Sequence, residues 1–410
     1  MPTPLYASPF PRLDLSLDEK EELCHTAMTL VDEVQALFEQ FLWRDKGRVD
    51  ERQWALVRER EDVRVYHDRR PGAGTGNKDM NLLWLVGSVI GGLNEAMYGV
   101  INPTADDMRV KTAYVQDTLL DSAVLESILE PTKEQPFQSM SVRWFVKGVP
   151  LHVRAISKHR DNVYLEATGM RQLSNGERYG YHLMHSIGFD KTPPLPQYDR
   201  FNMSICTIWR QATADRVQAY MTSYIEIKDS IFVPLVVKST ADALVSIWTY
   251  TQCAQRKKLA WLIRRKALLK DDSDRVSVLQ EGCSVCGSHS RSTRRGIKSA
   301  CAACAAYTCK KCRIKRDLSI FAPDGQLLRH EMRFCVRCVT FVNSLDAEVV
   351  ARDEALGAHN DDPAMWAMLG RIMGGRVQSA TRQASLVSSG SSVDLYTTGS
   401  SSSSLSKGYA

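Results

Sequence analysis

Residues 161–189 read DNVYLEATGMRQLSNGERYGYHLMHSIGF, and this stretch decides the class of fold. Two runs rich in β-branched and aromatic residues lie on either side of the turn residues Ser174, Asn175 and Gly176. Runs of this kind that flank a turn signal are typical of neighbouring strands. The stretch therefore predicts a β-sheet at the centre of the chain.

The same pattern continues on both sides, between residues 50 and 230. Turn signals such as PGAGTG at 71–76 and TPPLP at 192–196 separate the runs. The runs do not alternate with helices, which favours a largely antiparallel sheet over a βαβ arrangement. One short helix is expected at DSAVLESILE, 121–130. The further strand-like runs are EDVRVY (61–66), NLLWLVGS (81–88), RVKTAYVQ (109–116), SVRWFVKG (141–148), LHVRAIS (151–157), FNMSICTIWR (201–210) and VQAYMTSYIEIK (217–228).

Two helices are expected to flank this sheet. Within the N-terminal segment 1–49, apolar residues at 17–43 recur at steps of three and four, which predicts an amphipathic helix packed on the next domain. At 234–269, Pro234 suits the first position of a second, long helix whose end is very basic. The chain is thus predicted to be an α+β protein, with an antiparallel sheet followed by one long helix.

Eight of the eleven cysteines form four C-x2-C pairs, separated by 14, 4 and 22 residues. Residues 1–22 have no basic flank and no apolar core, so we expect no secretory signal and a compartment in which clustered cysteines bind metal. Eight thiolates predict two closed, structural Zn²⁺ sites with no coordination position left for a catalytic water. The expected ligands are Cys283, Cys286, Cys301, Cys304, Cys309, Cys312, Cys335 and Cys338.

Four such pairs, with only four residues between the second and the third, resemble the FYVE/PHD superfamily. A cysteine as the fifth ligand is similar to FYVE fingers, and the resemblance covers roughly 275–343. It implies interleaved pairs. One zinc would be held by Cys283, Cys286, Cys309 and Cys312, and the other by Cys301, Cys304, Cys335 and Cys338.

FYVE fingers that bind phosphatidylinositol 3-phosphate carry W-x-x-D, R-(R/K)-H-H-C-R-x-C-G and R-V-C motifs. Here the central stretch 297–305 reads IKSACAACA, and 333–335 reads RFC, so the finger resembles a degenerate member. We expect the finger to dock either on an anionic membrane, which can contain phosphoinositides, or on a protein. The anion contacts that the resemblance implies are Arg294, Arg295, Lys298 and Arg333.

A sheet, one long final helix and a finger directly downstream together resemble a START-type lipid-binding domain followed by a FYVE finger. The resemblance covers 50–268 and implies a helix-grip fold, in which the helix lies across a curved sheet. It also implies an apolar cavity that holds one sterol, phospholipid or ceramide-like molecule. The alternative is a fully packed core without a ligand.

The charge of the chain is concentrated in one segment. Between residues 256 and 337, Lys and Arg number 20 against 7 Asp and Glu, although the whole chain carries only +6. This segment is expected to meet an anionic partner. A nucleic acid is disfavoured because the finger has few aromatic residues for stacking. No apolar run reaches the ~20 residues of a membrane span.

Enzyme motifs are not found in the sequence. PGAGTG lacks the G-x-G-x-x-G spacing, and no Walker lysine or G-x-S-x-G appears. His182 and His185 are three residues apart on a predicted strand, so they are expected on opposite faces rather than on one metal. Trp144, Trp209 and Trp248 either pack in the core or line a cavity.

The sequence therefore predicts a cytoplasmic, non-enzymatic lipid-binding protein, peripheral on endosomal membranes through its finger. The alternative is an adaptor with an empty START-like core and a protein-binding finger. Residues 344–375 are expected to form one more helix. The Ser-rich tail, 385–410, has little apolar content and is expected to be disordered.

Overall fold

The fold is taken from a computed structural model. It describes residues 8–70, 72, 75–115, 119–148, 158–227, 233–268, 282–288, 300–321, 325–355 and 378–379. The expected strand at 151–157 and the Ser-rich tail, 385–410, lie outside these residues, as does 356–375 of the expected C-terminal helix.

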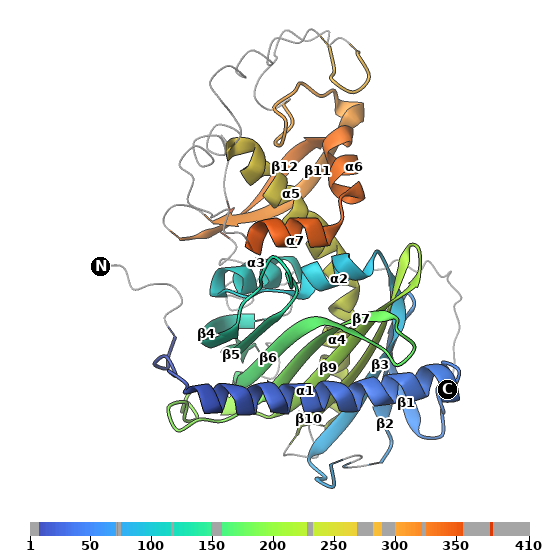
Figure 1. Cartoon of the computed structure of the whole chain (residues 1–410), viewed down its shortest axis with the longest axis vertical. Coiled ribbons are helices and arrows are strands. Elements are labelled where there is room, and N and C mark those ends of the chain that lie inside the picture. The colour runs from blue at the N-terminus through green and yellow to red at the C-terminus, as the bar shows by residue number, and fades with distance from the viewer. Residues whose placement is uncertain are drawn as a thin grey trace, which may run out of the picture.

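A ten-stranded sheet forms the centre of the larger domain (Figure 1). Its strand order is β1-β2-β3-β10-β9-β7-β6-β5-β4, antiparallel throughout, and the short β8 pairs in parallel with β6. The strands are β1 (Trp54–Arg60), β2 (Val63–Asp68), β3 (Met80–Ile90), β4 (Leu119–Leu129), β5 (Ser139–Lys147), β6 (Arg160–Gln172), β7 (Arg178–Ser186), β8 (Asp199–Arg200), β9 (Met203–Thr213) and β10 (Arg216–Glu226).

The hairpin β6–β7 contains the stretch that predicted the sheet. Its strands pair from Tyr164 opposite Ser186 to Gln172 opposite Arg178. In the turn, Gly176 adopts a φ of 84°, a left-handed conformation that glycine takes without a steric penalty. The predicted antiparallel sheet is confirmed.

The second predicted helix crosses one face of the sheet, which makes the helix-grip arrangement. It consists of α4 (Val233–Leu244), a 3-10 turn (Val245–Thr249) and α5 (Tyr250–Leu268), rather than one uninterrupted helix. In the 3-10 turn, Thr249 Oγ1 donates to the Ser246 carbonyl at 2.7 Å. Such side-chain bonds compete with the helical backbone pattern, and β-branched residues weaken it further.

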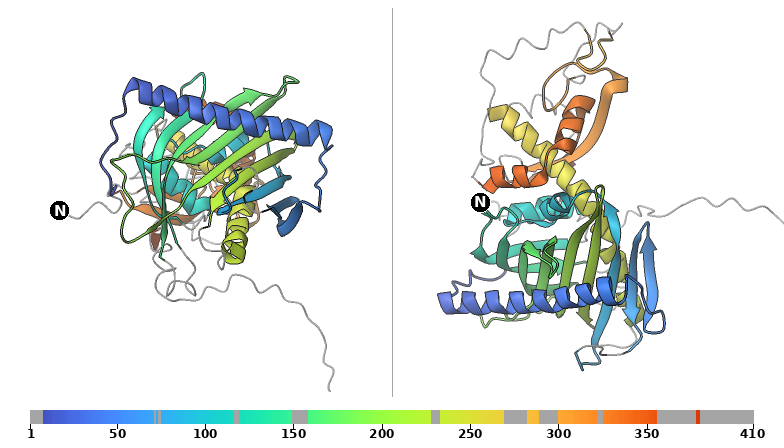
Figure 2. Two further views of the ribbon diagram at one scale, coloured as in Figure 1. Left: turned by 90° about the horizontal axis from the view of Figure 1, so that it is seen from below. Right: turned by 45° about the vertical axis from the view of Figure 1, so that its right-hand side comes forward.

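The opposite face of the sheet is covered by α1 (Leu17–Glu39), which continues into a π-helical turn, Gln40–Arg44. Figure 2 shows α1 and α4 on opposite sides of the strands. Ser16 and Glu19 form a capping box at the start of α1. Phe38 and Phe41 pack against Trp84 and Tyr220, so the apolar stripe of α1 is buried in its own core layer.

Two predicted elements were wrong. Of the helix expected at 121–130, residues 121–129 belong to the bulged strand β4, on which Ala123 and Leu125 are buried and the buried Glu126 is bound by Lys20. Residues 109–116, expected as a strand, largely fall in helix α3 (Ala105–Val115). The capping pair Thr104–Asp107, with mutual bonds of 3.1 and 3.2 Å, starts this helix. A threonine followed three residues later by an aspartate is a helix-start signal that the strand prediction did not take into account.

The cysteine-rich segment packs directly on α5, as Figure 1 and Figure 2 show. It contains the hairpin β11 (Arg313–Phe321) and β12 (Leu327–Cys335), followed by α6 (Val336–Ser344). Leu259 and Ile263 of α5 share one apolar cluster with Phe334 and the ligand candidate Cys301. The helix that closes the sheet domain is therefore also part of the core of the finger.

Helix α7 (Ala347–Ala355) lies in the predicted segment 344–375 and returns to the sheet domain, beside α2 (Leu93–Val100). Its Val350 belongs to the same core cluster as α2 and α4. None of the helices that the structure describes has the length and apolar character needed to cross a membrane.

Candidate functional site

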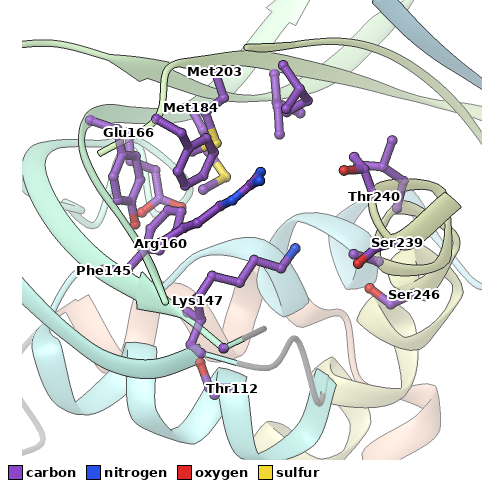
Figure 3. A pocket seen from close by; sticks show the side chains of 18 of the residues that line it. Thr112, Phe145, Lys147, Arg160, Glu166, Met184, Met203, Ser239, Thr240 and Ser246 are labelled. Carbon is purple, nitrogen blue, oxygen red and sulfur yellow. The ribbon is translucent and has the colours of Figure 1, made fainter. Parts of the chain in front are cut away.

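A cavity of about 230 Å³ lies between the sheet and the helices α3 and α4 (Figure 3). Leu235 of α4 lines the cavity and is 37% exposed, so the cavity reaches the surface beside the start of α4. Most of the wall is apolar. The apolar lining residues are Met108, Leu119, Phe145, Met184, Met203, Ile205, Ile225, Leu235, Val236 and Leu244.

The wall follows from strand alternation. Met203 and Ile205 are two residues apart on β9, so both side chains point to the helix side of the sheet. His182 and Met184 do the same on β7. His185 is not among the lining residues, and its Nδ1 lies 3.0 Å from Ser204 Oγ.

A charged cluster is buried at one end of the cavity. Glu166 of β6 and His182 of β7 both line it, and Glu166 Oε1 lies 2.6 Å from His182 Nε2. Glu166 Oε2 lies 2.6 Å from Arg143 Nη1, and Lys111 Nζ is 4.0 Å from Oε1. Arg143 also donates to the carbonyl of Asn102 at 2.8 Å and to Ser141 Oγ at 2.6 Å.

These contacts set the protonation states of the cluster. Burial raises the pKa of Glu166, but the charges of Arg143 and Lys111 and the bond from His182 outweigh burial and lower the pKa to about 2. Burial lowers the pKa of His182 from its ordinary value. At neutral pH the cluster thus contains a carboxylate, a guanidinium and a neutral imidazole.

Sequence reasoning did not find Glu166 or Arg143. The signal was present, because each is a lone charged residue inside a run that reads as a strand buried on both faces, NVYLEATGM and SVRWFV. Charged residues are rarely buried without a partner. The three tryptophans Trp144, Trp209 and Trp248 are absent from the lining and pack in the core clusters instead.

The structure also gathers the cysteines into two groups of four. Within each group, all the Sγ atoms lie within 4.8 Å of one another. The pairs are interleaved in both. One group is Cys283, Cys286, Cys309 and Cys312, and the other is Cys301, Cys304, Cys335 and Cys338.

The geometry of both groups fits a tetrahedral metal ion. Bonds of ~2.3 Å to four thiolates place neighbouring sulfurs ~3.8 Å apart. Cys286 and Cys309 have Sγ atoms 3.7 Å apart, and those of Cys304 and Cys335 are 3.9 Å apart. Both groups can therefore hold a metal ion with four protein ligands each.

Backbone amides already point at these sulfurs. The amide of Cys309 donates to Cys283 Sγ at 3.3 Å, and that of Cys335 donates to Cys301 Sγ at 3.2 Å. A backbone hydrogen bond from Cys312 lowers the pKa of Cys309 to about 6. Such bonds favour the thiolate, which is the form that binds metal.

The predicted anion contacts are only partly placed. Arg294, Arg295 and Lys298 lie outside the described residues. Arg333 is on β12, opposite Lys315 of β11, and its carbonyl accepts a bond of 2.7 Å from the amide of Ala302. Of the four predicted anion contacts, Arg333 is thus the one that lies among the described residues.

Among solved structures, this chain is similar to human StAR-related lipid transfer protein 5, with 14% identity and a TM-score of 0.39 over 55% of this chain and 96% of that chain. Human STARD10 gives 13% identity and a TM-score of 0.36, over 52% of this chain and 79% of that chain. The human StarD13 (DLC2) lipid transfer and protein localization domain gives 13% identity and a TM-score of 0.36, over 52% of this chain and 94% of that chain. No protein-family model matches the chain, and neither does any curated protein. The helix-grip assignment rests on the strand order and the helix across the sheet.

Proposed function

We propose that this chain is a non-enzymatic lipid-binding protein whose START-like domain encloses one hydrophobic lipid. The observation that carries the proposal is the largely apolar cavity between the sheet and α4, with its opening beside Leu235. Burying hydrocarbon there is worth ~25 cal/mol per Å² of apolar surface. Catalysis is not proposed, because Glu166 is the one acidic residue in the described lining, and its oxygens are engaged by Arg143 and His182.

Native mass spectrometry of the full-length protein, purified without chelator, tests this directly. We expect two metal ions and one lipid-sized adduct, whose fragmentation identifies the lipid class. Two metal ions without an adduct, even after incubation with mixed lipids, would contradict the lipid-binding function and favour the adaptor with an empty core.

We further propose that 275–343 is a FYVE-type finger with two structural Zn²⁺ ions that docks on an anionic membrane. Support comes from the two groups of four cysteines and from exposed cations on the same segment. Those that make no ion pair within the described residues are Lys310, Lys311, Arg316 and Arg337. A cytoplasmic protein that binds endosomal membranes peripherally would use such a surface, since each basic residue near an acidic membrane contributes ~1 kcal/mol.

Vesicle co-sedimentation tests the docking surface. Vesicles containing phosphatidylserine, with or without phosphatidylinositol 3-phosphate, are compared with neutral vesicles. The double variant Arg316→Glu/Arg337→Glu should bind the acidic vesicles at least ten-fold more weakly, because it reverses two surface charges. Arg48→Glu, on the sheet domain, is the control and should bind as the wild type does. Equal binding to neutral and acidic vesicles would point to a protein partner for the finger.

A further inference from the structure

Basic residues outnumber acidic ones in the described lining of the cavity. The basic residues are Lys111, Lys147 and Arg160, and the one acidic residue among those described is Glu166. That carboxylate is already paired with Arg143, which is itself buried. The one carboxylate of the described wall is therefore already engaged, and a further cation buried in an apolar cavity is costly without a counter-charge.

Arg160 and Lys147 lie directly opposite each other in the antiparallel pair β5–β6. Both side chains reach into the cavity, as Figure 3 shows. Like charges in this position destabilise a sheet unless something of opposite charge lies between them.

Arg160 has no carboxylate partner of its own among the described residues. Its side chain forms no hydrogen bond or ion pair with them, although it is partly buried. The nearest acidic influence is Asp199, its neighbour on β8, whose side chain is exposed to solvent. Burial lowers the pKa of Arg160, and Asp199 opposes this only in part.

Hydroxyl groups face these two cations from the helix side. Ser239 and Thr240 come from α4, Ser246 comes from the 3-10 turn that follows it, and Thr112 comes from α3 (Figure 3). Hydroxyls donate hydrogen bonds to carboxylate or phosphate oxygens, and arginine binds such oxyanions in a fork. One side of the cavity thus carries positive charge, and the other side carries neutral hydrogen-bond donors.

The size of the cavity limits the hydrocarbon. At about 230 Å³, the cavity lies below the ~300–1,000 Å³ of pockets for drug-sized ligands. One acyl chain that partly emerges beside Leu235 fits better than fused rings or two chains.

Building on the proposed lipid-binding function, we propose that the ligand is a single-chain lipid with an oxyanion head group. Arg160 and Lys147 bind the carboxylate or phosphate, the hydroxyls of α4 bind its remaining oxygens, and the chain lies against Met184, Met203 and Ile205. An oxyanion at this point supplies the counter-charge that Arg160 lacks among the described residues. The inference specifies the class of lipid, and it can fail while lipid binding itself stands.

Three fluorescent probes with the same acyl chain test the inference on the full-length protein. They are a fatty acid, a lysophosphatidate and a neutral monoacylglycerol. We expect at least one anionic probe to bind about ten-fold or more tighter than the neutral probe, since a charge-assisted hydrogen bond is lost in the latter. The relative affinities of the two anionic probes then distinguish carboxylate from phosphate.

Arg160→Gln should remove that preference while leaving the affinity for the neutral probe within about two-fold. Lys147→Gln should also reduce the preference for the anionic probes. Arg48→Gln, which removes an exposed charge elsewhere, should leave this preference unchanged. Without ligand, Arg160→Gln should melt at the same temperature or higher, because it removes an uncompensated cation.

Equal binding of all three probes, unaffected by Arg160→Gln, would overturn the oxyanion head group alone. Failure of every probe to bind a folded protein would overturn the lipid cavity as well.

Discussion

Arg143 and Glu166 form an ion pair inside the sheet domain, with Nη1 and Oε2 2.6 Å apart and side chains only 1% and 5% exposed. They come from the neighbouring strands β5 and β6, and Glu166 turns its other oxygen to His182. Breaking a buried pair by removing one partner is more costly than replacing both, because a charge is left uncompensated. The pair therefore makes the part of the cavity wall that contains Glu166 sensitive to single substitutions.

Glu166→Gln should lower the free energy of unfolding by ~3–5 kcal/mol, because it leaves Arg143 buried without a counter-charge. Urea unfolding followed by circular dichroism measures the loss. Glu177→Gln is the matched control, since Glu177 pairs with Arg210 at the surface and such pairs contribute ~0–1 kcal/mol. Similar losses in both variants would show that the buried pair has no special role.

The stability of the domain should also depend on pH through Glu166. Its pKa is about 2 in the folded protein, below the ordinary value of 4.5, so the unfolded chain binds the proton more readily. The contribution is fully present above pH 4.5 and is lost as the pH falls towards 2. Unfolding curves at several pH values should therefore converge for wild type and Glu166→Gln on acidification. A constant difference between them would contradict the lowered pKa.

Cys301→Ser should reduce the bound metal from two ions to one, as counted by native mass spectrometry. Because Cys301 shares a cluster with Leu259 and Ile263 of α5, we also expect the melting temperature of the whole protein to fall. Cys24→Ser, a thiol outside both groups, is the control. An unchanged metal count would contradict the interleaved grouping.

The docking of helix α7, which follows the finger, on the sheet domain can be tested in the same way. Val350 is fully buried in the core cluster that contains α2, whereas the adjacent Val349 is 50% exposed. Val350→Ala should destabilise the protein by ~2 kcal/mol through lost burial and a residual cavity. Val349→Ala should change the stability by less than ~0.5 kcal/mol. Equal effects in thermal unfolding would mean that α7 does not dock as described.

The sequence predicted those features that depend on short-range pattern. Runs of strand-forming residues on either side of Asn175 and Gly176 predicted the neighbouring strands β6 and β7, and the periodicity at 17–43 predicted α1. Where local signals compete, the prediction was wrong. The run at 109–116 is rich in strand-forming residues, but the cap at Thr104 and Asp107 and packing against α5 make it helical.

By itself, the sequence determined the antiparallel sheet, the helix after it and a cysteine spacing suited to two metal sites, because these follow from residue type at fixed short separations. Only the tertiary structure decided which charges meet. Arg143 reaches Glu166, and Lys147 faces Arg160, through the register of β5 and β6. That register is set by packing across the whole sheet, since a shift of one residue would turn every side chain to the other face. For the same reason, only the fold showed that α5 serves the sheet and the finger together.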